Sequence, residues 1–212
     1  MCYRVCMKIE IWSDVVCPWC YIGKRRLERA LAGLPAGSQA QVVWRSFELD
    51  PGAPRQRTVA PAEHLAHKYG VSVAEAQMMI ARVADVAKEE GLDYRLDEAR
   101  SGNTFDAHRL EHFAAEKGVG DRAVEVLMDA YFCKALPVGD RDALAALAPL
   151  MGLDETEVRV MLEGDAYADA VRADEARANQ LGISGVPFFI IDGKAQISGA
   201  QPVEVFAQAL RG

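Results

Sequence analysis

The order in which strand-like and helix-like segments follow one another constrains the fold of this chain more than any other feature. Residues 9–12 alternate apolar and polar side chains, as a strand does, and residues 18–34 carry apolar side chains at helical spacing. Residues 42–47 are rich in β-branched and aromatic side chains, which favour a second strand. A strand, a helix and a strand in this order predict a parallel, right-handed βαβ unit.

The last forty residues return to strands. A helix ends near residue 182, and the apolar run 188–191 has the composition of a strand. The Asp-Gly pair at 192–193 is a hairpin signal, and residues 195–197 supply the second strand of that hairpin. Pro202 then favours the start of a final helix. This half of the chain is therefore predicted as αββα.

The stretch between these two halves is predicted to be helical throughout. Helices are expected over residues 121–133 and 141–151, among others. Three patterns mark helix starts: Ser72 with Glu75, Asn103 with Thr104, and Asp154 with Glu157.

Without the helical stretch, the order βαβ–αββα is that of the thioredoxin fold. We therefore predict an α/β protein in which a thioredoxin-like domain, residues 8–55 and 166–212, is interrupted by an all-helical insertion domain, residues 56–165.

Charge and hydropathy exclude several function classes. The net charge of −7 is spread along the 212 residues, whereas nucleic acids and anionic membranes attract basic surfaces. No apolar run approaches the roughly 18–20 residues that a membrane span needs. Because the first residues lack the apolar core of a signal peptide, we expect a cytoplasmic protein.

The Cys-Pro-Trp-Cys motif at 17–20 lies where the first strand gives way to the first helix. There, Cys17 would meet the free N–H groups and positive end of the helix, which stabilise a thiolate. Cys20 lies about one turn further, where a second thiol can resolve a mixed disulfide. This placement favours redox chemistry over a zinc site or a structural disulfide.

The zinc alternative lacks a second Cys-X-X-Cys motif. It would draw on histidines at helical spacing, all of which lie in the predicted insertion: His64, His67, His108 and His112. We expect no metal. Five cysteines, an odd number, also argue against a disulfide framework; Cys133 is expected to be a buried, inert thiol, and Cys2 and Cys6 to lie in an irregular N-terminus.

Three segments together resemble the DsbA-like thioredoxin-domain family, and more narrowly its FrnE-type cytoplasmic disulfide oxidoreductases and isomerases. The segments are SDVVCPWCYIG at 13–23, NTFDAHR at 103–109 and SGVPFF at 184–189. The resemblance covers the chain from Lys8 onward, including the insertion.

The resemblance implies a role for each residue of the motif region. Cys17 would be the nucleophile and Cys20 the resolving thiol, with Pro187 in the cis form packed against them. Val186 would offer its backbone to an extended substrate, and Pro18 and Trp19 would contact substrate and influence the reduction potential.

A competing branch of the same superfamily contains kappa-class glutathione transferases and 2-hydroxychromene-2-carboxylate isomerases. Those enzymes have serine at the position of Cys17 and act on small aromatic substrates with bound glutathione. They also carry an Asp-Arg pair where this chain has Gln201-Pro202. Both departures favour disulfide chemistry, with the glutathione-dependent enzyme as the alternative.

The resemblance also implies that Asn103 and His108 face the active-site cleft, where His108 would tune the Cys17 thiolate or assist proton transfer. The alternative is that both residues have only structural roles, Asn103 as a helix cap and His108 as a packed side chain in the interior.

Expected partners are protein or small-molecule thiols and disulfides. No cofactor is expected beyond the redox-active disulfide, with glutathione as a candidate electron partner, and the chain is expected to be a monomer or homodimer.

Overall fold

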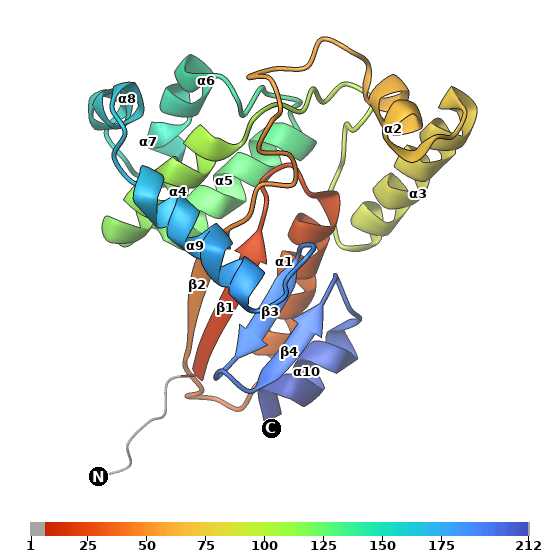
Figure 1. The fold of residues 1–212 in the computed structure, drawn as a ribbon. Helices are drawn as coiled ribbons and strands as arrows, with labels where there is room; N and C mark the ends of the chain where they lie inside the picture. Colours follow the sequence, from red (N-terminus) through yellow and green to blue (C-terminus); the bar gives the residue numbers. More distant parts are fainter. Residues whose placement is uncertain (1–6, 212) are drawn as a thin grey trace.

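A four-stranded sheet forms the lower half of the molecule in Figure 1. The computed structural model describes residues 7–211. The strands are β1 (Met7–Ser13), β2 (Ala40–Ser46), β3 (Phe188–Ile191) and β4 (Ala195–Ser198), in the order β2-β1-β3-β4. β1 runs parallel to β2 and antiparallel to β3, and β3 and β4 form a hairpin. The predicted βαβ unit, C-terminal hairpin and α/β thioredoxin fold are confirmed.

Helices cover both faces of this sheet (Figure 1). Side chains alternate along β1, so Ile9 and Ile11 pack with helices α1 (Pro18–Ala32) and α10 (Val203–Arg211). Trp12 points to the opposite face, where its indole donates a hydrogen bond to the carbonyl of Asp174 at 3.1 Å. Asp174 belongs to helix α9 (Ala168–Gln180), which covers that face.

Seven helices lie between β2 and α9 in the chain. They are α2 (Pro61–Tyr69), α3 (Val73–Glu89), α4 (Phe105–Glu116), α5 (Gly120–Phe132), α6 (Arg141–Ala146), α7 (Ala148–Met151) and α8 (Glu155–Glu163). In Figure 1, α4–α8 cover the end of the sheet where β1 and β2 finish, and α2 and α3 stand to one side as a helical pair. One apolar core joins α3–α8 to the start of α1, so the insertion packs directly against the Cys-Pro-Trp-Cys motif.

Local details correct two sequence expectations. The helical stretch predicted over 141–151 is present but divided at Leu147 into α6 and α7, because Pro149 has no N–H and its ring would crowd the preceding turn. Thr104 occupies the N-cap of α4 without a side-chain hydrogen bond; the Asn103 Oδ1 accepts from the N–H of Phe105 instead.

The other two helix starts are confirmed. Ser72 and Glu75 form a reciprocal capping box at α3, and Asp154 accepts a hydrogen bond from the N–H of Glu157 at α8. The boundary between thioredoxin-like and insertion domains stays a prediction. Cys2 and Cys6 lie outside the described residues, and within residues 7–211 no helix is long and apolar enough to cross a membrane.

Candidate active site

Cys17 occupies the N-cap position of α1, directly after the loop that leaves β1. Its N–H donates to the carbonyl of Asp14 at 3.0 Å, and its own carbonyl accepts from the N–H of Cys20 at 3.0 Å. Pro18 follows at the first helical position, where the missing N–H has no intrahelical partner to lose. This loop holds Cys17 at the positive end of the helix, as the sequence predicts.

Asp14 fixes this loop, and sequence reasoning gave it no role. Its carboxylate accepts hydrogen bonds from the N–H groups of Val16 at 3.3 Å and Leu49 at 2.7 Å. The first bond is an Asx-turn, in which an aspartate accepts from the backbone N–H two residues further along the chain. A turn of this kind depends on local sequence and could have been predicted. The second ties the motif to the segment after β2, and only the fold reveals that contact.

The Val186–Pro187 peptide is cis, as predicted, and it lies against the first cysteine. The Cys17 Sγ lies 3.4 Å from the carbonyl oxygen of Val186 and donates to it. Gly23 in α1 permits this close packing, because a Cβ there would come within 3.2 Å of the Pro187 ring and 3.1 Å of Phe189. Cys17, Val186 and Pro187 are thus brought together in one site.

Cys20 is the more deeply placed of the two thiols. It is 1% exposed, and both cysteines are free thiols in this structure. Burial raises the pKa of Cys20 well above its ordinary value, and the neighbouring Cys17 raises it further. The Ser13 hydroxyl and the Asp14 amide act in the opposite direction. Cys20 is therefore held as a protonated thiol beneath Cys17, as a resolving cysteine requires.

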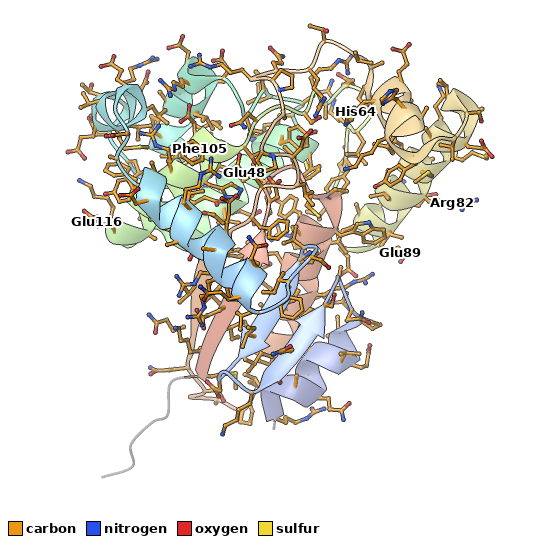
Figure 2. All side chains as sticks on the ribbon, in the orientation of Figure 1. Glu48, His64, Arg82, Glu89, Phe105 and Glu116 are labelled. Carbon is orange, nitrogen blue, oxygen red and sulfur yellow. The ribbon has the colours of Figure 1, made fainter. Side chains whose placement is uncertain are left out.

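A cavity of about 660 Å³ lies beside Cys17. One wall comes from the motif and the cis-proline loop, through Val16, Pro18, Trp19 and Val186. The opposite wall comes from the segment after β2 and from α2 and α3, and it includes Leu49, Val59, Leu65, Tyr69, Ile80 and Val83. His64 on α2 also lines the cavity, and Figure 2 shows where it lies on that helix. The volume and mostly apolar walls suit an organic ligand or a peptide side chain.

A family model for the DSBA-like thioredoxin domain matches residues 8–211, nearly the whole chain. This chain belongs to the DsbA-like family. A probable DsbA oxidoreductase from Streptomyces coelicolor is 47% identical and superposes with a TM-score of 0.91, covering 96% of this chain and 88% of its own. Membership places the chain in a family of thiol–disulfide oxidoreductases.

Two further proteins resemble this DsbA-like chain along most of its length. The uncharacterized protein YwbO of Bacillus subtilis (strain 168) is 30% identical over 204 residues, which span 95% of this chain and 94% of that protein. A 2-hydroxychromene-2-carboxylate isomerase is 13% identical with a TM-score of 0.71, covering 96% of this chain and 94% of the isomerase. At that identity the isomerase shares the fold, and its chemistry does not carry over.

His108 does not face the cavity of this DsbA-like protein. It is completely buried, its Nδ1 lies 2.8 Å from the Glu111 carboxylate, and its Nε2 lies 3.7 Å from that of Asp14. Burial alone would lower the pKa of His108, but the two carboxylates outweigh it and raise that pKa well above the ordinary value. The full burial of His108 contradicts the predicted position facing the cleft; the imidazole lies behind the active-site loop, beside Asp14.

Asn103 is partly exposed and does not itself line the cavity, although Gly102 and Thr104 on either side of it do, so its predicted substrate contact stays a prediction. Its side-chain amide donates to the Glu48 carboxylate at 3.3 Å and to the carbonyl of Pro51 at 3.2 Å, so it fastens the segment after β2. Figure 2 shows Glu48 close to Phe105 near α9. Arg172 of α9 joins them, with its guanidinium 2.6 Å from Glu48 and 4.3 Å from the centre of the Phe105 ring.

Tyr94 is a second residue at the site that sequence reasoning missed. Its hydroxyl donates to the carbonyl of Pro18 at 2.8 Å, and its ring stacks on Phe132 with centroids 4.7 Å apart. Burial raises the pKa of Tyr94, so the hydroxyl stays protonated and remains a donor. No local pattern marks this tyrosine, which reaches the motif only through the packing of the insertion against α1.

The histidine pairs do not assemble a metal site. His108 faces Asp14 and Glu111, whereas His112 lies 3.2 Å from Asp174 and 3.1 Å from the Ser46 hydroxyl. Across residues 7–211, no group of three or more His, Cys, Asp or Glu side chains is arranged to hold a metal ion.

Proposed function

We propose that this protein exchanges disulfides through the Cys17–Cys20 dithiol, by way of a mixed disulfide on Cys17. The observation that carries the proposal is the pairing of one thiol that lines the cavity with a second, protonated thiol buried beneath it. The similarity to a probable DsbA oxidoreductase supports the same chemistry.

The reducing direction has two steps that balance. The Cys17 thiolate attacks one sulfur of a substrate disulfide, forms the mixed disulfide and releases the first substrate thiolate. Cys20 then attacks the Cys17 sulfur, the intramolecular disulfide forms, and the second substrate thiolate leaves with the proton that Cys20 gives up. Two electrons pass from the dithiol to the substrate. The reverse sequence oxidises a substrate dithiol, and attack without resolution isomerises wrong disulfides.

Polypeptides with an exposed cysteine are the proposed substrates. Val186 is half-buried and lies beside Cys17, so an extended segment can pair with its backbone while an apolar side chain enters the cavity. Trp19 and Leu49 on the cavity walls are each 39% exposed, which leaves apolar surface for such a segment. The disulfide itself is the redox group, glutathione is the proposed electron partner, and the cytoplasm is the proposed compartment.

Trapping the mixed disulfide tests this mechanism. Cys20→Ser leaves Cys17 without its resolving partner, so incubation of the variant thiol with scrambled, disulfide-bonded ribonuclease should yield a covalent complex in about one-to-one ratio, with release of one ribonuclease thiol. Mass spectrometry of the digest should place the linkage on Cys17, and dithiothreitol should release it. The wild-type protein is the control, because it should resolve the complex before it accumulates.

The mechanism is wrong if the linkage forms on Cys133 instead, or if no complex forms at all. Saturable, non-covalent binding of glutathione without any mixed disulfide would favour the glutathione-dependent alternative. Isothermal titration of the wild-type dithiol form with reduced glutathione distinguishes the two cases.

A further inference from the structure

The cavity beside Cys17 has the opposite charge balance from the chain as a whole. The chain has 31 acidic residues against 24 Lys and Arg and 4 His. The acidic side chains that line the cavity are Asp14 and Asp50. Four basic side chains line it, one from the segment after β2 and three from α2: Arg57, His64, His67 and Lys68. An acidic protein thus places basic groups around its candidate nucleophile.

Both acidic side chains of this cavity already have partners. Asp50 forms an ion pair with the guanidinium of Arg57. Asp14 is buried, accepts hydrogen bonds from two backbone N–H groups, and lies 3.7 Å from the imidazole of His108. Neither carboxylate therefore neutralises the basic groups that α2 contributes.

Lys68 is the cation of the cavity that keeps its charge unpaired. Within residues 7–211 no carboxylate pairs with its ammonium, which lies 5.8 Å from the centre of the Tyr69 ring. Both side chains are exposed at the end of α2. An ammonium held over the face of an exposed aromatic ring stays accessible to an anionic ligand.

His64 adds to the same positive region. It lies one helical turn before Lys68, so the two side chains share the face of α2 that lines the cavity. Burial lowers the pKa of His64, and the positive charges of Arg57 and Lys68 lower it further. His64 is therefore mostly neutral near pH 7, where its imidazole can donate a hydrogen bond to an anion.

We propose that this cavity selects polypeptide disulfides that carry an acidic residue a few positions from the reactive cysteine, with the Lys68 ammonium pairing with that carboxylate. The proposal rests on the disulfide-exchange function proposed above and names the substrates of that site. Opposite charges guide the segment into the cavity, and the exposed apolar side chains of Val59 and Tyr69 receive its neighbouring residues.

The step that this pairing accelerates is the formation of the mixed disulfide. The bond between Cys17 and one substrate sulfur forms, the substrate disulfide breaks, and the other substrate sulfur leaves as a thiolate. Lys68 determines specificity and takes no part in these bond changes.

Two matched peptide disulfides test the inference. Each is a symmetric dimer of a short peptide with a single cysteine and a leucine, and the two differ only in glutamate or glutamine at the same flanking positions. Quenched fluorophores report cleavage by an excess of the reduced protein, and Cys17→Ser gives the background. The glutamate peptide should react about fivefold faster, the upper value for one exposed ion pair. Raising the salt concentration from about 0.01 M to about 1 M should remove most of this preference.

Charge variants at Lys68 identify the group responsible. Lys68→Gln should make the two rates about equal, and Lys68→Glu should invert the preference, because like charges repel. The glutamine variant also serves if the glutamate variant does not fold. Lys88→Glu makes the same charge change in the last turn of α3, outside the cavity, and should keep the preference of the wild type.

The outcomes separate this inference from the function on which it rests. Equal rates for the two peptides, or an unchanged preference in both Lys68 variants, would overturn the inference and leave the exchange mechanism intact. Oxidised glutathione, which also carries carboxylates, is the third substrate. If its cleavage alone depended on Lys68, the charge would serve a small molecule and the inference would again be wrong. If none of the three substrates were cleaved above the Cys17→Ser background, the proposed function itself would fail.

Discussion

Replacing Cys17 with serine is expected to abolish disulfide exchange, with a loss of at least about a thousandfold in rate. A serine hydroxyl at this N-cap still fits the helix, but it is not ionised near neutral pH and cannot form a disulfide. Far-ultraviolet circular dichroism should therefore stay unchanged while activity disappears. The measurement is the glutathione-driven reduction of insulin, followed by the turbidity of the released B chain.

Cys133 provides the matched control for that experiment. It follows α5 and is half-buried. Burial is the main cause that raises the pKa of its thiol to about 11, and the nearby Asp129 carboxylate adds to the effect. Very little of it is thiolate at neutral pH, so Cys133→Ser should keep activity within about twofold. If Cys17→Ser retained activity while Cys133→Ser lost it, Cys133 and not Cys17 would be the nucleophile.

The framework of the site was predictable because its signals are local. Each signal depends on only a few neighbouring residues: the alternating pattern of β1, the proline at the start of α1, and the Asp-Gly turn. Asp192 and Gly193 adopt the positive φ values of 49° and 69° that this turn requires. The cis form of Pro187 was predictable only through its place in the fold, since an isolated X–Pro bond gives no such information.

The supporting residues were missed or misplaced because their contacts are made across the fold. Asp14 binds Leu49, and Tyr94 reaches Pro18, over separations that no periodic pattern encodes. His108 was predicted to face the cleft but is fully buried, because the sequence shows which residues share a helix and does not show which face of α4 meets the cavity.

His108 is expected to contribute most to stability among the residues behind the site. Its imidazolium lies between the carboxylates of Glu111 and Asp14, both in the interior. His108→Ala would leave the two carboxylates buried without their cation, a change that costs about 3–5 kcal/mol in the free energy of unfolding. Urea denaturation at pH 6 measures this difference. His67→Ala on the exposed surface of α2 is the control and should change the free energy of unfolding by less than about 0.5 kcal/mol.

The sign of the pH dependence follows from the direction of the pKa shift. Because the folded protein raises the pKa of His108 above its unfolded value of about 6.5, it binds the proton more tightly than the unfolded chain does. The stabilisation is therefore complete below about pH 6.5 and declines as pH rises toward the folded pKa. The gap between wild type and His108→Ala should narrow across pH 7, 8 and 9 in the same urea experiment. A gap that stays constant with pH would mean that His108 stabilises the loop as a neutral, packed side chain, and the charged bridge to Asp14 and Glu111 would have to be abandoned.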